Sequence, residues 1–474
     1  CNYNNNIIYY FTISYSFIRN KSSTLDIYST FIFMKYFLPF ILSFVFFSCN
    51  KQPSKQLKIG NYRGVLKIQD NQELPFIFKV KKNNLIEIYN ADEIIEVDEI
   101  TYKNDSIYIQ TPVFEGYIAA EISDNNKLKG HFIKPSLNRI VPFLARKNDE
   151  RFKSKNETSF NITGNWETVF RPNSKENKYI AKGIFTQKKN KVKGTFRTTT
   201  GDYRYLEGII DGDSLKLSTF DGAHAFLFTA KVTDSSMIGN FYSGNHWKEP
   251  FIAKLNNNYE LPDENTLTIL NDGYKNFNFS FPDENGNLIS YVDKQFKNKI
   301  VIVQIMGTWC PNCLDESKYY VEYLKKNKNT DVQFVALAFE TDKTQKKAFE
   351  KINRLKKRLN ITYPILLAQY GGSNKKEAAK KLPMLNHILS YPTTVFIDKK
   401  GNQEHKFGID RITDLRNVKA KIKSIESSPV KVTTFIDTND NNKMDSNEKK
   451  LNGVEVEIAN QKIITDINGE ANFY

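Results

Sequence analysis

The segment 307–313, with the sequence GTWCPNC, constrains the fold of this chain more than any other part of it. It follows the apolar run Ile300–Met306, which is typical of a strand buried on both faces. After it, residues 314–327 have the apolar periodicity of a helix. Cys310 and Cys313 are therefore expected where a buried strand ends and a helix begins, the edge at which open α/β sheets place their chemistry.

This position suits thiol chemistry for a physical reason. Only a thiolate attacks a disulfide, so the attacking cysteine needs a lowered pKa. A helix N-terminus supplies free N–H groups and roughly half a positive charge, and both favour the anion. We expect Cys310 to lie just outside the first turn, exposed and able to attack. Cys313 follows one turn later on the same side and would resolve the mixed disulfide, while Pro311 suits the first helical turn.

Three other interpretations of the two cysteines are weaker. A Cys-x-x-Cys pair can be half of a zinc site, but no second pair exists and the nearest histidine, His387, is far away in the sequence. A static disulfide would need neither the strand-to-helix junction nor the preceding Trp309. A peroxiredoxin motif needs Thr or Ser three residues before its reactive cysteine, and Gly307 stands there instead.

The Trp309-Cys310-x-x-Cys313 core resembles the thioredoxin superfamily, and most closely its exported TlpA/ResA-like branch, over about residues 275–425. The segment 391–394, Tyr-Pro-Thr-Thr, resembles the cis-proline loop that opposes the dithiol in this superfamily. The resemblance implies that Pro392 is cis and keeps metals from the thiols. It also implies that Tyr391 and Thr393 bind an extended substrate chain, with the Tyr391 backbone pairing with it.

Glu316 follows Cys313 by three residues and so falls on the same helix face. It is similar to the active-site carboxylate of the ResA-like branch, which implies that it tunes proton uptake by the dithiol. The alternative is a first-turn glutamate stabilised by the helix dipole. Gln304 stands where thioredoxins carry a buried, titrating Asp, so the acid–base role shifts to Glu316 or to water. Gly408 fits the closing glycine of the family.

The N-terminal region has the pattern of an export signal. Met34 and Lys35 precede the apolar stretch 36–48, which is too short to span a bilayer and reads as a secretory signal. The end of this stretch and Cys49 resemble a bacterial lipobox, which implies that Cys49 is lipidated and becomes the first mature residue. The alternative is a plain signal peptide with an incidental cysteine. We interpret residues 1–33 as upstream read-through and 49–56 as a polar tether.

Residues 57–150 and 160–255 contain an internal repeat of short alternating strands. Gly60-Asn61-Tyr62 matches Gly164-Asn165-Trp166, and three further matches follow in the same order. We expect two copies of one antiparallel β unit, either as two small barrels or as two halves of a larger curved sheet. The opening motif looks faintly like lipocalin-type barrels. His224, in a turn of the second copy, is more often structural than functional at such a position.

The net charge of +15 does not indicate nucleic-acid binding. The lysines are spread along the chain in pairs and triplets, alternate with Asp, Glu and Asn, and form no arginine-rich block. Such a distribution is typical of a solvated surface.

Residues 429–474 form a separate, short module. Oxygen ligands recur with the spacing of an EF-hand loop, and the surrounding sequence resembles the calcium-binding B-type repeats of bacterial surface adhesins, which are β-sandwich modules. The resemblance implies calcium; the alternative is an Asp/Asn-rich loop without metal, and the chain stops in a strand-like run, as a truncated module would. The implied ligands are Asp437, Asn439, Asn441, Lys443 (through its carbonyl oxygen), Asp445 and Glu448.

Together these patterns predict a multidomain chain: tandem antiparallel β units, an α/β thioredoxin-like domain over 266–425 with a mixed sheet and a last helix at 412–425, and a short β module. We expect a lipid-anchored thiol–disulfide oxidoreductase of the cell envelope, facing the periplasm. By resemblance it would reduce disulfides of exported proteins, need no redox cofactor and take electrons from a membrane thiol-transfer protein. The alternatives are a lipoprotein whose β units bind a ligand while the dithiol is structural or sensory, and an adhesion or scaffold protein led by the calcium module.

Overall fold

The computed structural model describes the chain over residues 55–263, 266–274, 276–328, 331–372, 374–397, 399, 403–408, 430–439, 444–458 and 461–473, and these residues belong to one compact unit, Ser54–Tyr474. The predicted signal segment 34–48, Cys49 and the predicted helix 412–425 lie outside the described residues. Within those residues no helix has both the length and the apolar character needed to cross a membrane.

The first β repeat is a nine-stranded antiparallel sheet with the strand order β4-β3-β2-β1-β9-β8-β7-β6-β5. Successive strands are neighbours within β1–β4 and within β5–β9, and the last strand, β9, returns to pair with the first. The edge strands β4 and β5 do not pair with each other among the described residues, so the sheet stays open there. Its strands are β1 Gly60–Lys67, β2 Glu73–Val80, β3 Ile86–Asn90, β4 Glu93–Val97, β5 Ile100–Lys103, β6 Ser106–Gln110, β7 Tyr117–Ile122, β8 Leu128–Lys134 and β9 Arg139–Lys147.

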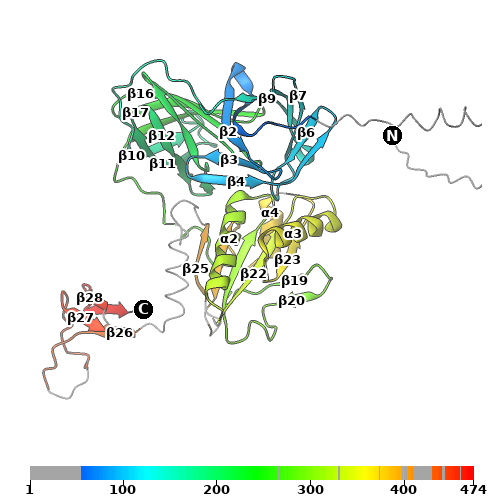
Figure 1. The fold of residues 1–474 in the computed structure, drawn as a ribbon. Helices are drawn as coiled ribbons and strands as arrows, with labels where there is room; N and C mark the ends of the chain where they lie inside the picture. The colour runs from blue at the N-terminus through cyan, green and yellow to red at the C-terminus, as the bar shows by residue number, and fades with distance from the viewer. Residues whose placement is uncertain are drawn as a thin grey trace, which may run out of the picture. The chain divides into compact units, whose positions relative to one another are not determined.

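The second repeat has the same antiparallel plan, but its sheet closes on itself. β11 pairs with both β10 and β12, and β12 also pairs with β14, which completes the ring through β18. Figure 1 shows these strands in green. They are β10 Gly164–Phe170, β11 Tyr179–Lys188, β12 Lys191–Thr198, β13 Gly201–Asp202, β14 Leu206–Asp211, β15 Ser214–Phe220, β16 Ala225–Val232, β17 Ser236–Ser243 and β18 Trp247–Leu255.

Positions matched between the two repeats have matching environments. Gly60 and Gly164 begin β1 and β10 with φ of 138° and 137°, which a side chain rarely adopts. The aromatic residues two positions later, Tyr62 and Trp166, are both 0% exposed. The expected tandem antiparallel β units are therefore confirmed, as two separate sheets of which one is open and one closed.

The second repeat packs into the core of the first. Phe220, at the end of β15, stacks on Phe76 with ring centroids 4.3 Å apart and meets Phe132 edge-on at 5.0 Å. The buried Asn90 amide donates to the Phe220 carbonyl oxygen (2.9 Å), and its oxygen accepts from the Phe220 N–H (3.1 Å). The two repeats therefore share one apolar core where the first sheet is open.

The third part of the chain is an α/β domain with a five-stranded sheet of order β23-β22-β21-β24-β25. β21 runs parallel to β22, β22 runs parallel to β23, and β24 and β25 are antiparallel, which is the mixed sheet expected. Its elements are β19 Ser280–Pro282, β20 Leu288–Ser290, β21 Ile300–Met306, α2 Pro311–Lys326, β22 Val332–Phe339, α3 Gln345–Leu359, β23 Ile365–Gln369, α4 Lys375–Lys381, β24 Thr393–Ile397 and β25 Gln403–Gly408.

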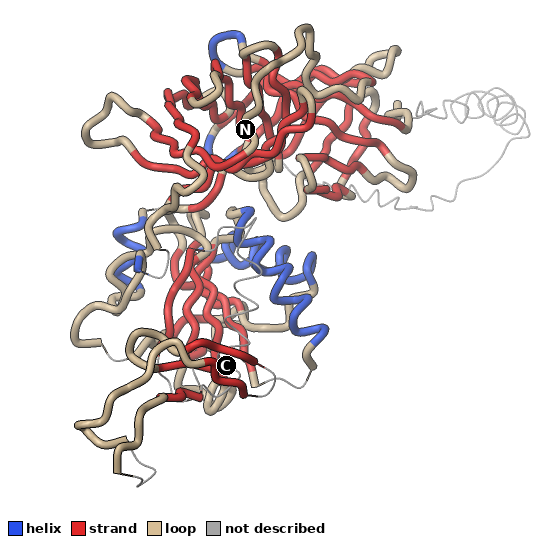
Figure 2. Tube along the Cα trace, turned by 90° about the vertical axis from the view of Figure 1, so that its left-hand side faces the viewer, coloured by secondary structure: helices blue, strands red, loops and turns tan. Residues whose placement is uncertain are grey.

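Helices cover both faces of this sheet, as Figure 2 shows. Alternate residues of β21 divide between two cores: Ile300 and Ile302 pack with α2 and α3, while Val301 and Val303 pack with α4 and with Phe277. The thioredoxin-like α/β class is confirmed. The short module that follows consists of two antiparallel pairs, β26 Val430–Thr433 with β29 Glu470–Phe473 and β27 Glu455–Ile458 with β28 Gln461–Ile464.

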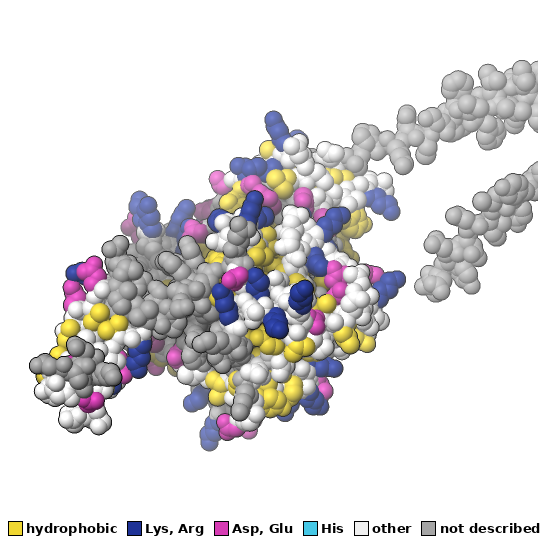
Figure 3. Space-filling view, turned by 90° about the horizontal axis from the view of Figure 1, so that it is seen from below, with side chains coloured by type: hydrophobic (Ala, Val, Ile, Leu, Met, Phe, Trp, Pro, Cys, Tyr) yellow, Lys and Arg dark blue, Asp and Glu magenta, His cyan; other side chains and the backbone are white. Residues whose placement is uncertain are grey.

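On one face of the molecule the charged side chains of the described residues are dispersed. On the face shown in Figure 3, Lys and Arg side chains are interspersed with acidic, apolar and other polar groups rather than forming one continuous basic surface. This distribution agrees with a solvated surface.

One buried arginine connects both β repeats to the start of α2. Arg204 is 3% exposed, and its guanidinium lies 2.7 Å from Asp221, 2.8 Å from Glu93 and 3.3 Å from Asp315. It also donates to the side-chain oxygen of Asn312 at 2.8 Å. Although burial opposes ionisation, these carboxylates raise the Arg204 pKa, so the group stays charged.

A second arginine makes a similar connection on α3. Arg354 lies 2.8 Å from Glu99 and donates to the carbonyl oxygen of Phe114 at 3.2 Å. Both Arg354 and Arg204 thus join the redox domain to the β repeats through named polar contacts.

Replacing Arg204 tests the first connection. Arg204→Met leaves three buried carboxylates without their cation, so we expect the free energy of unfolding at about pH 8 to fall by roughly 3–5 kcal/mol. The loss should shrink towards about pH 5, because carboxyls such as Asp315, whose pKa burial raises to about 6 despite Arg204, take up protons in the folded state. Urea denaturation at both pH values measures this. As a control, Lys193→Met breaks an exposed pair with Asp92 and should cost less than about 1 kcal/mol; equal losses in the two variants would contradict the assignment.

Candidate functional site

The junction between β21 and α2 places the two cysteines as predicted. Cys310 is the N-cap of α2, with extended backbone dihedrals, and Pro311 is the first helical residue. The backbone N–H of Cys313 donates to Cys310 Sγ at 3.1 Å, and the two sulfur atoms are joined as a disulfide. A free helix-terminal N–H therefore points at the sulfur that would carry negative charge in the reduced protein.

The expectation that Cys310 is exposed is wrong. Cys310 is 5% exposed and Cys313 is 0% exposed. Cys310 faces a cavity of about 810 Å³ whose walls include Trp309 and Tyr391 and, from the second β repeat, residues 198–203. The sequence motif predicts the helix N-terminus but contains no information about this cover, which comes from residues more than a hundred positions away.

The cis-proline loop opposes the disulfide. The Tyr391–Pro392 peptide bond is cis, as the resemblance implied, and Cys310 Sγ lies 3.3 Å from the carbonyl oxygen of Tyr391. Trp309 packs edge-on against the Tyr391 ring at 5.4 Å and donates its indole N–H to the carbonyl oxygen of Phe339. The side chain of Trp309 is thereby fixed beside the sulfur.

Thr393 differs from expectation. Its side chain is 0% exposed, and its hydroxyl donates to the carbonyl oxygen of Ser390 at 2.9 Å. The hydroxyl therefore holds the loop together, and the backbone of Thr393 is paired with Ile305 of β21 and Gly408 of β25, so this residue offers no exposed surface to an extended substrate chain.

Glu316 is a buried carboxyl below the disulfide. It is 1% exposed and accepts hydrogen bonds from Tyr320 (2.6 Å), Thr394 (2.6 Å) and Gln304 (2.8 Å). Burial raises the pKa of Glu316, and the three hydrogen bonds oppose this shift. The alternative from the sequence, a first-turn glutamate stabilised by the helix dipole, is wrong because α2 begins at Pro311 and its first turn contains no acidic residue.

Gln304 links Glu316 to the cysteines. Its amide nitrogen also lies 3.2 Å from the carbonyl oxygen of Cys313, and its oxygen accepts from the Ser317 hydroxyl. The Gln304 amide cannot titrate. Among the side chains of this buried cluster that can, Glu316 is the one nearest to Cys313 in the sequence.

The sequence reading missed Glu340. This carboxyl is 0% exposed and accepts from the backbone N–H (2.8 Å) and hydroxyl (2.6 Å) of Thr308, two residues before Cys310. Burial raises the pKa of Glu340 to about 7, against these hydrogen bonds. The sequence did contain a signal for a site residue here: Glu340 directly follows the apolar strand β22, at the same carboxyl edge of the sheet as the dithiol.

The sequence favours a structural role for His224, and in the structure its side chain contacts a buried carboxylate. Its Nδ1 lies 3.2 Å from Asp221, the carboxylate that also pairs with Arg204. His224 is therefore attached to the buried charge cluster at the start of α2.

Two residues of the predicted calcium loop, Asp445 and Glu448, accept hydrogen bonds from neighbouring residues. The Glu448 carboxylate accepts from the backbone N–H groups of Thr438 and Asp445, and the Asn439 amide nitrogen donates to Asp445. Over the part of the chain that is described, no group of three or more His, Cys, Asp or Glu side chains is arranged to hold a metal. Asn441 and Lys443 lie outside it, so calcium stays a prediction.

Comparisons with known proteins agree with this geometry. Residues 271–422 match the protein family described as Redoxin. The thiol–disulfide oxidoreductases ResA of Bacillus thuringiensis subsp. konkukian and of Bacillus cereus are each 30% identical to this chain over 125 residues, which is 26% of this chain and 62% of either relative. The chain thus spans less than two thirds of the curated relatives that it matches.

Two solved structures are each similar to about a third of the chain. A thiol-disulfide oxidoreductase from Bacteroides fragilis has 19% identity, a TM-score of 0.25 and coverage of 32% of this chain and 99% of its own. A thioredoxin family protein from Chlorobium tepidum, described as a thiol:disulfide interchange protein, has 21% identity, a TM-score of 0.26 and coverage of 33% and 100%. With its Cys310–Cys313 pair at a helix N-terminus and its opposing cis-proline, the segment 271–422 is a thioredoxin-superfamily domain of the TlpA/ResA-like type.

Proposed function

We propose that this protein is a thiol–disulfide oxidoreductase that works through Cys310 and Cys313 and reduces disulfides of exported proteins. The observation that carries the proposal is the disulfide at the N-terminus of α2, with the Tyr391 carbonyl oxygen 3.3 Å from the outer sulfur. An extended chain beside this loop would place its own cystine against Cys310.

Reduction proceeds in two exchanges. The Cys310 thiolate attacks one sulfur of the substrate disulfide, and the other substrate sulfur leaves as a thiolate. The Cys313 thiolate then attacks Cys310 Sγ, which releases the second substrate thiolate and closes the Cys310–Cys313 disulfide. Two electrons pass from the dithiol to the substrate, whose two sulfurs take up two protons.

Glu316 controls the second step. Its carboxylate and the Cys313 thiolate are two negative charges on one buried helix face, so each makes the other harder to form. A protonated Glu316 removes this repulsion and lets Cys313 ionise. We infer that Glu316 couples the second exchange to a proton.

The proposal also covers location and electron supply. The lipobox-like sequence before Cys49 supports a lipid anchor in the cell envelope, with the redox domain facing the periplasm. We propose that a membrane thiol-transfer protein regenerates the dithiol and that the exchange needs no redox cofactor.

The redox couple tests the function and its direction. In the chain without residues 1–49, we expect Cys310 and Cys313 to form a reversible two-electron couple below about −220 mV, in the range of reductants. Thiol labelling after equilibration in dithiothreitol and glutathione buffers measures the potential, and Cys310→Ser serves as the non-cycling control. A potential near −120 mV would make the protein an oxidant, as about this value is typical of disulfide-forming catalysts. A pair that never cycles would exclude the oxidoreductase function.

Glu316→Gln tests the proton coupling. In the chain without residues 1–49 and with Cys310→Ser, Cys313 is the one cysteine left to react. Loss of the Glu316 carboxylate charge should lower the Cys313 pKa by roughly one unit. The pH profile of alkylation by iodoacetamide reports this pKa. Glu322→Gln, on the same helix but 67% exposed, is the matched control and should leave the profile in place. Identical profiles for all three proteins would contradict the role of Glu316.

Lipid attachment has its own test. Cells grown with an alkyne-tagged fatty acid should label the wild-type protein and leave Cys49→Ala unlabelled, because the acyl chain requires the Cys49 sulfur. Gel fluorescence after coupling a dye to the alkyne gives the result. Equal labelling of both proteins would show that the lipid, if present, is not on Cys49.

A further inference from the structure

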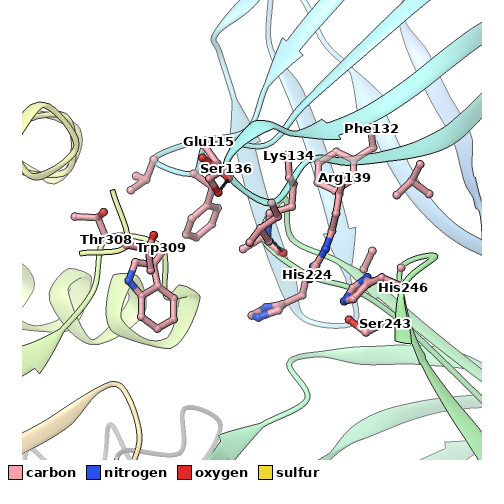
Figure 4. A pocket seen from close by; sticks show the side chains of 18 of the residues that line it. Glu115, Phe132, Lys134, Ser136, Arg139, His224, Ser243, His246, Thr308 and Trp309 are labelled. Atoms are coloured by element: carbon pink, nitrogen blue, oxygen red, sulfur yellow. Dashed lines mark hydrogen bonds between the residues drawn. The ribbon is translucent and has the colours of Figure 1, made fainter. Parts of the chain in front are cut away.

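Two adjoining cavities extend from the dithiol along the β repeats. The cavity of about 810 Å³ contains Cys310, and a second cavity of about 460 Å³ contains Thr308. Both include Trp309, so they meet at the indole ring. The other residues that line both are Arg139, His224, Ser243 and His246, and Figure 4 shows their side chains together at one side of the second cavity.

Two cations in this region lack a carboxylate partner. Among the described residues, no Asp or Glu oxygen lies within ion-pair distance of Lys134 or Arg139. Lys134 donates to the carbonyl oxygen of Ala223 at 2.9 Å. Burial lowers the pKa of both side chains, and for Lys134 the nearby Arg139 adds to this while Asp221 opposes it. Each cation would therefore be stabilised by an anion that entered the cavity.

Among the described residues, three carboxylates line these cavities: Glu249 and Glu115 have cation partners, and Asp202 accepts from the backbone N–H of Arg204. Glu249 is 3% exposed, pairs with Arg171 at 2.5 Å and accepts from the Tyr179 hydroxyl. Glu115 accepts from Ser136 and lies 3.7 Å from Lys351. Asp221, the acid nearest Lys134, is engaged by Arg204 and His224. Among the described residues, the second cavity is lined by three cations, Lys134, Arg139 and Lys351, and by one carboxylate, Glu115, so the charge of its walls is positive.

The remaining walls are apolar or neutral. Phe132 and Val141 are 3% exposed and line the second cavity together with Val113. Burial, with Arg139 and Lys134 nearby, lowers the pKa of His246 to about 4, so its ring is uncharged at neutral pH and can hydrogen bond without adding charge. An apolar pocket with a few convergent polar groups is typical of a specific ligand site.

We propose that these cavities bind the polypeptide next to the substrate cystine and select an acidic residue there through Lys134 and Arg139. The proposal rests on the proposed function and names its substrate class: exported chains with an Asp or Glu near the reacting cysteine. Arg139 lines the same cavity as Cys310, and Trp309 lines both cavities, so the acidic residue is expected close to the cystine along the bound chain.

The test compares two synthetic disulfide-linked peptide dimers, each labelled with a self-quenching dye. In one peptide the cysteine is flanked by Asp and Glu, and in the other by Asn and Gln. Charge-assisted hydrogen bonds contribute about 1.5–3 kcal/mol each, so we expect reduced wild-type protein to cleave the acidic dimer with a kcat/KM at least about 10-fold higher. The double variant Lys134→Gln, Arg139→Gln should bring this ratio close to one.

Three controls separate the possible results. Arg146→Gln changes an exposed arginine on the same strand, β9, outside both cavities, and should keep the wild-type ratio. Reduction of hydroxyethyl disulfide, which is uncharged, should be equal in all variants, so it reports the dithiol alone. Fluorescence anisotropy with serine-containing versions of the two peptides measures binding without any exchange.

A ratio near one in the wild type, or a ratio that survives in the double variant, overturns the inference while leaving the oxidoreductase intact. Failure to reduce hydroxyethyl disulfide contradicts the proposed function instead. In that event the anisotropy data still test the proposed acidic-residue site. Tighter binding of the acidic peptide that is lost in the double variant supports the site, and equal binding of the two peptides overturns it.

Discussion

The arrangement of the described domains depends on one buried guanidinium. Arg204 comes from the second β repeat, Glu93 from the first, and Asn312 and Asp315 from the helix that carries the dithiol. None of these charges is stable alone in an apolar interior, and each is acceptable only with the others in place. The cluster therefore couples three segments of the chain. It also fixes the cover over Cys310, because residues 201 and 202, which line the cavity, directly precede Tyr203 and Arg204.

The chemistry of the site could be predicted from the sequence because it is local. A buried strand, a Cys-x-x-Cys at a helix start and a glutamate three residues later all lie within a short segment, and helix geometry relates them. The cis bond before Pro392 came from resemblance, and the structure has it. The β repeats were recognisable because their glycine and aromatic positions recur in the same order.

What could not be predicted depends on contacts between distant segments. Nothing around Cys310 indicates that residues near position 200 cover it, and nothing around Arg204 indicates that its partners lie at 93, 221 and 315. Glu340 is a different case, since an acidic residue ending a buried strand beside the motif was a visible signal. Lys134 and Arg139 look like ordinary surface cations in the sequence. The positive charge of the cavity walls to which they belong is apparent only once the fold has brought those walls together.

The open sheet of the first repeat affects how the chain matures. Domains generally fold in order from the N-terminus as the chain is synthesised. Here the first repeat ends at Lys147, but Phe220, which stacks on its core at 4.3 Å, belongs to a later strand. The N-terminal half therefore keeps an unfilled apolar gap until most of the second repeat has emerged. The two repeats are therefore expected to mature together, because the later copy completes the core of the earlier one.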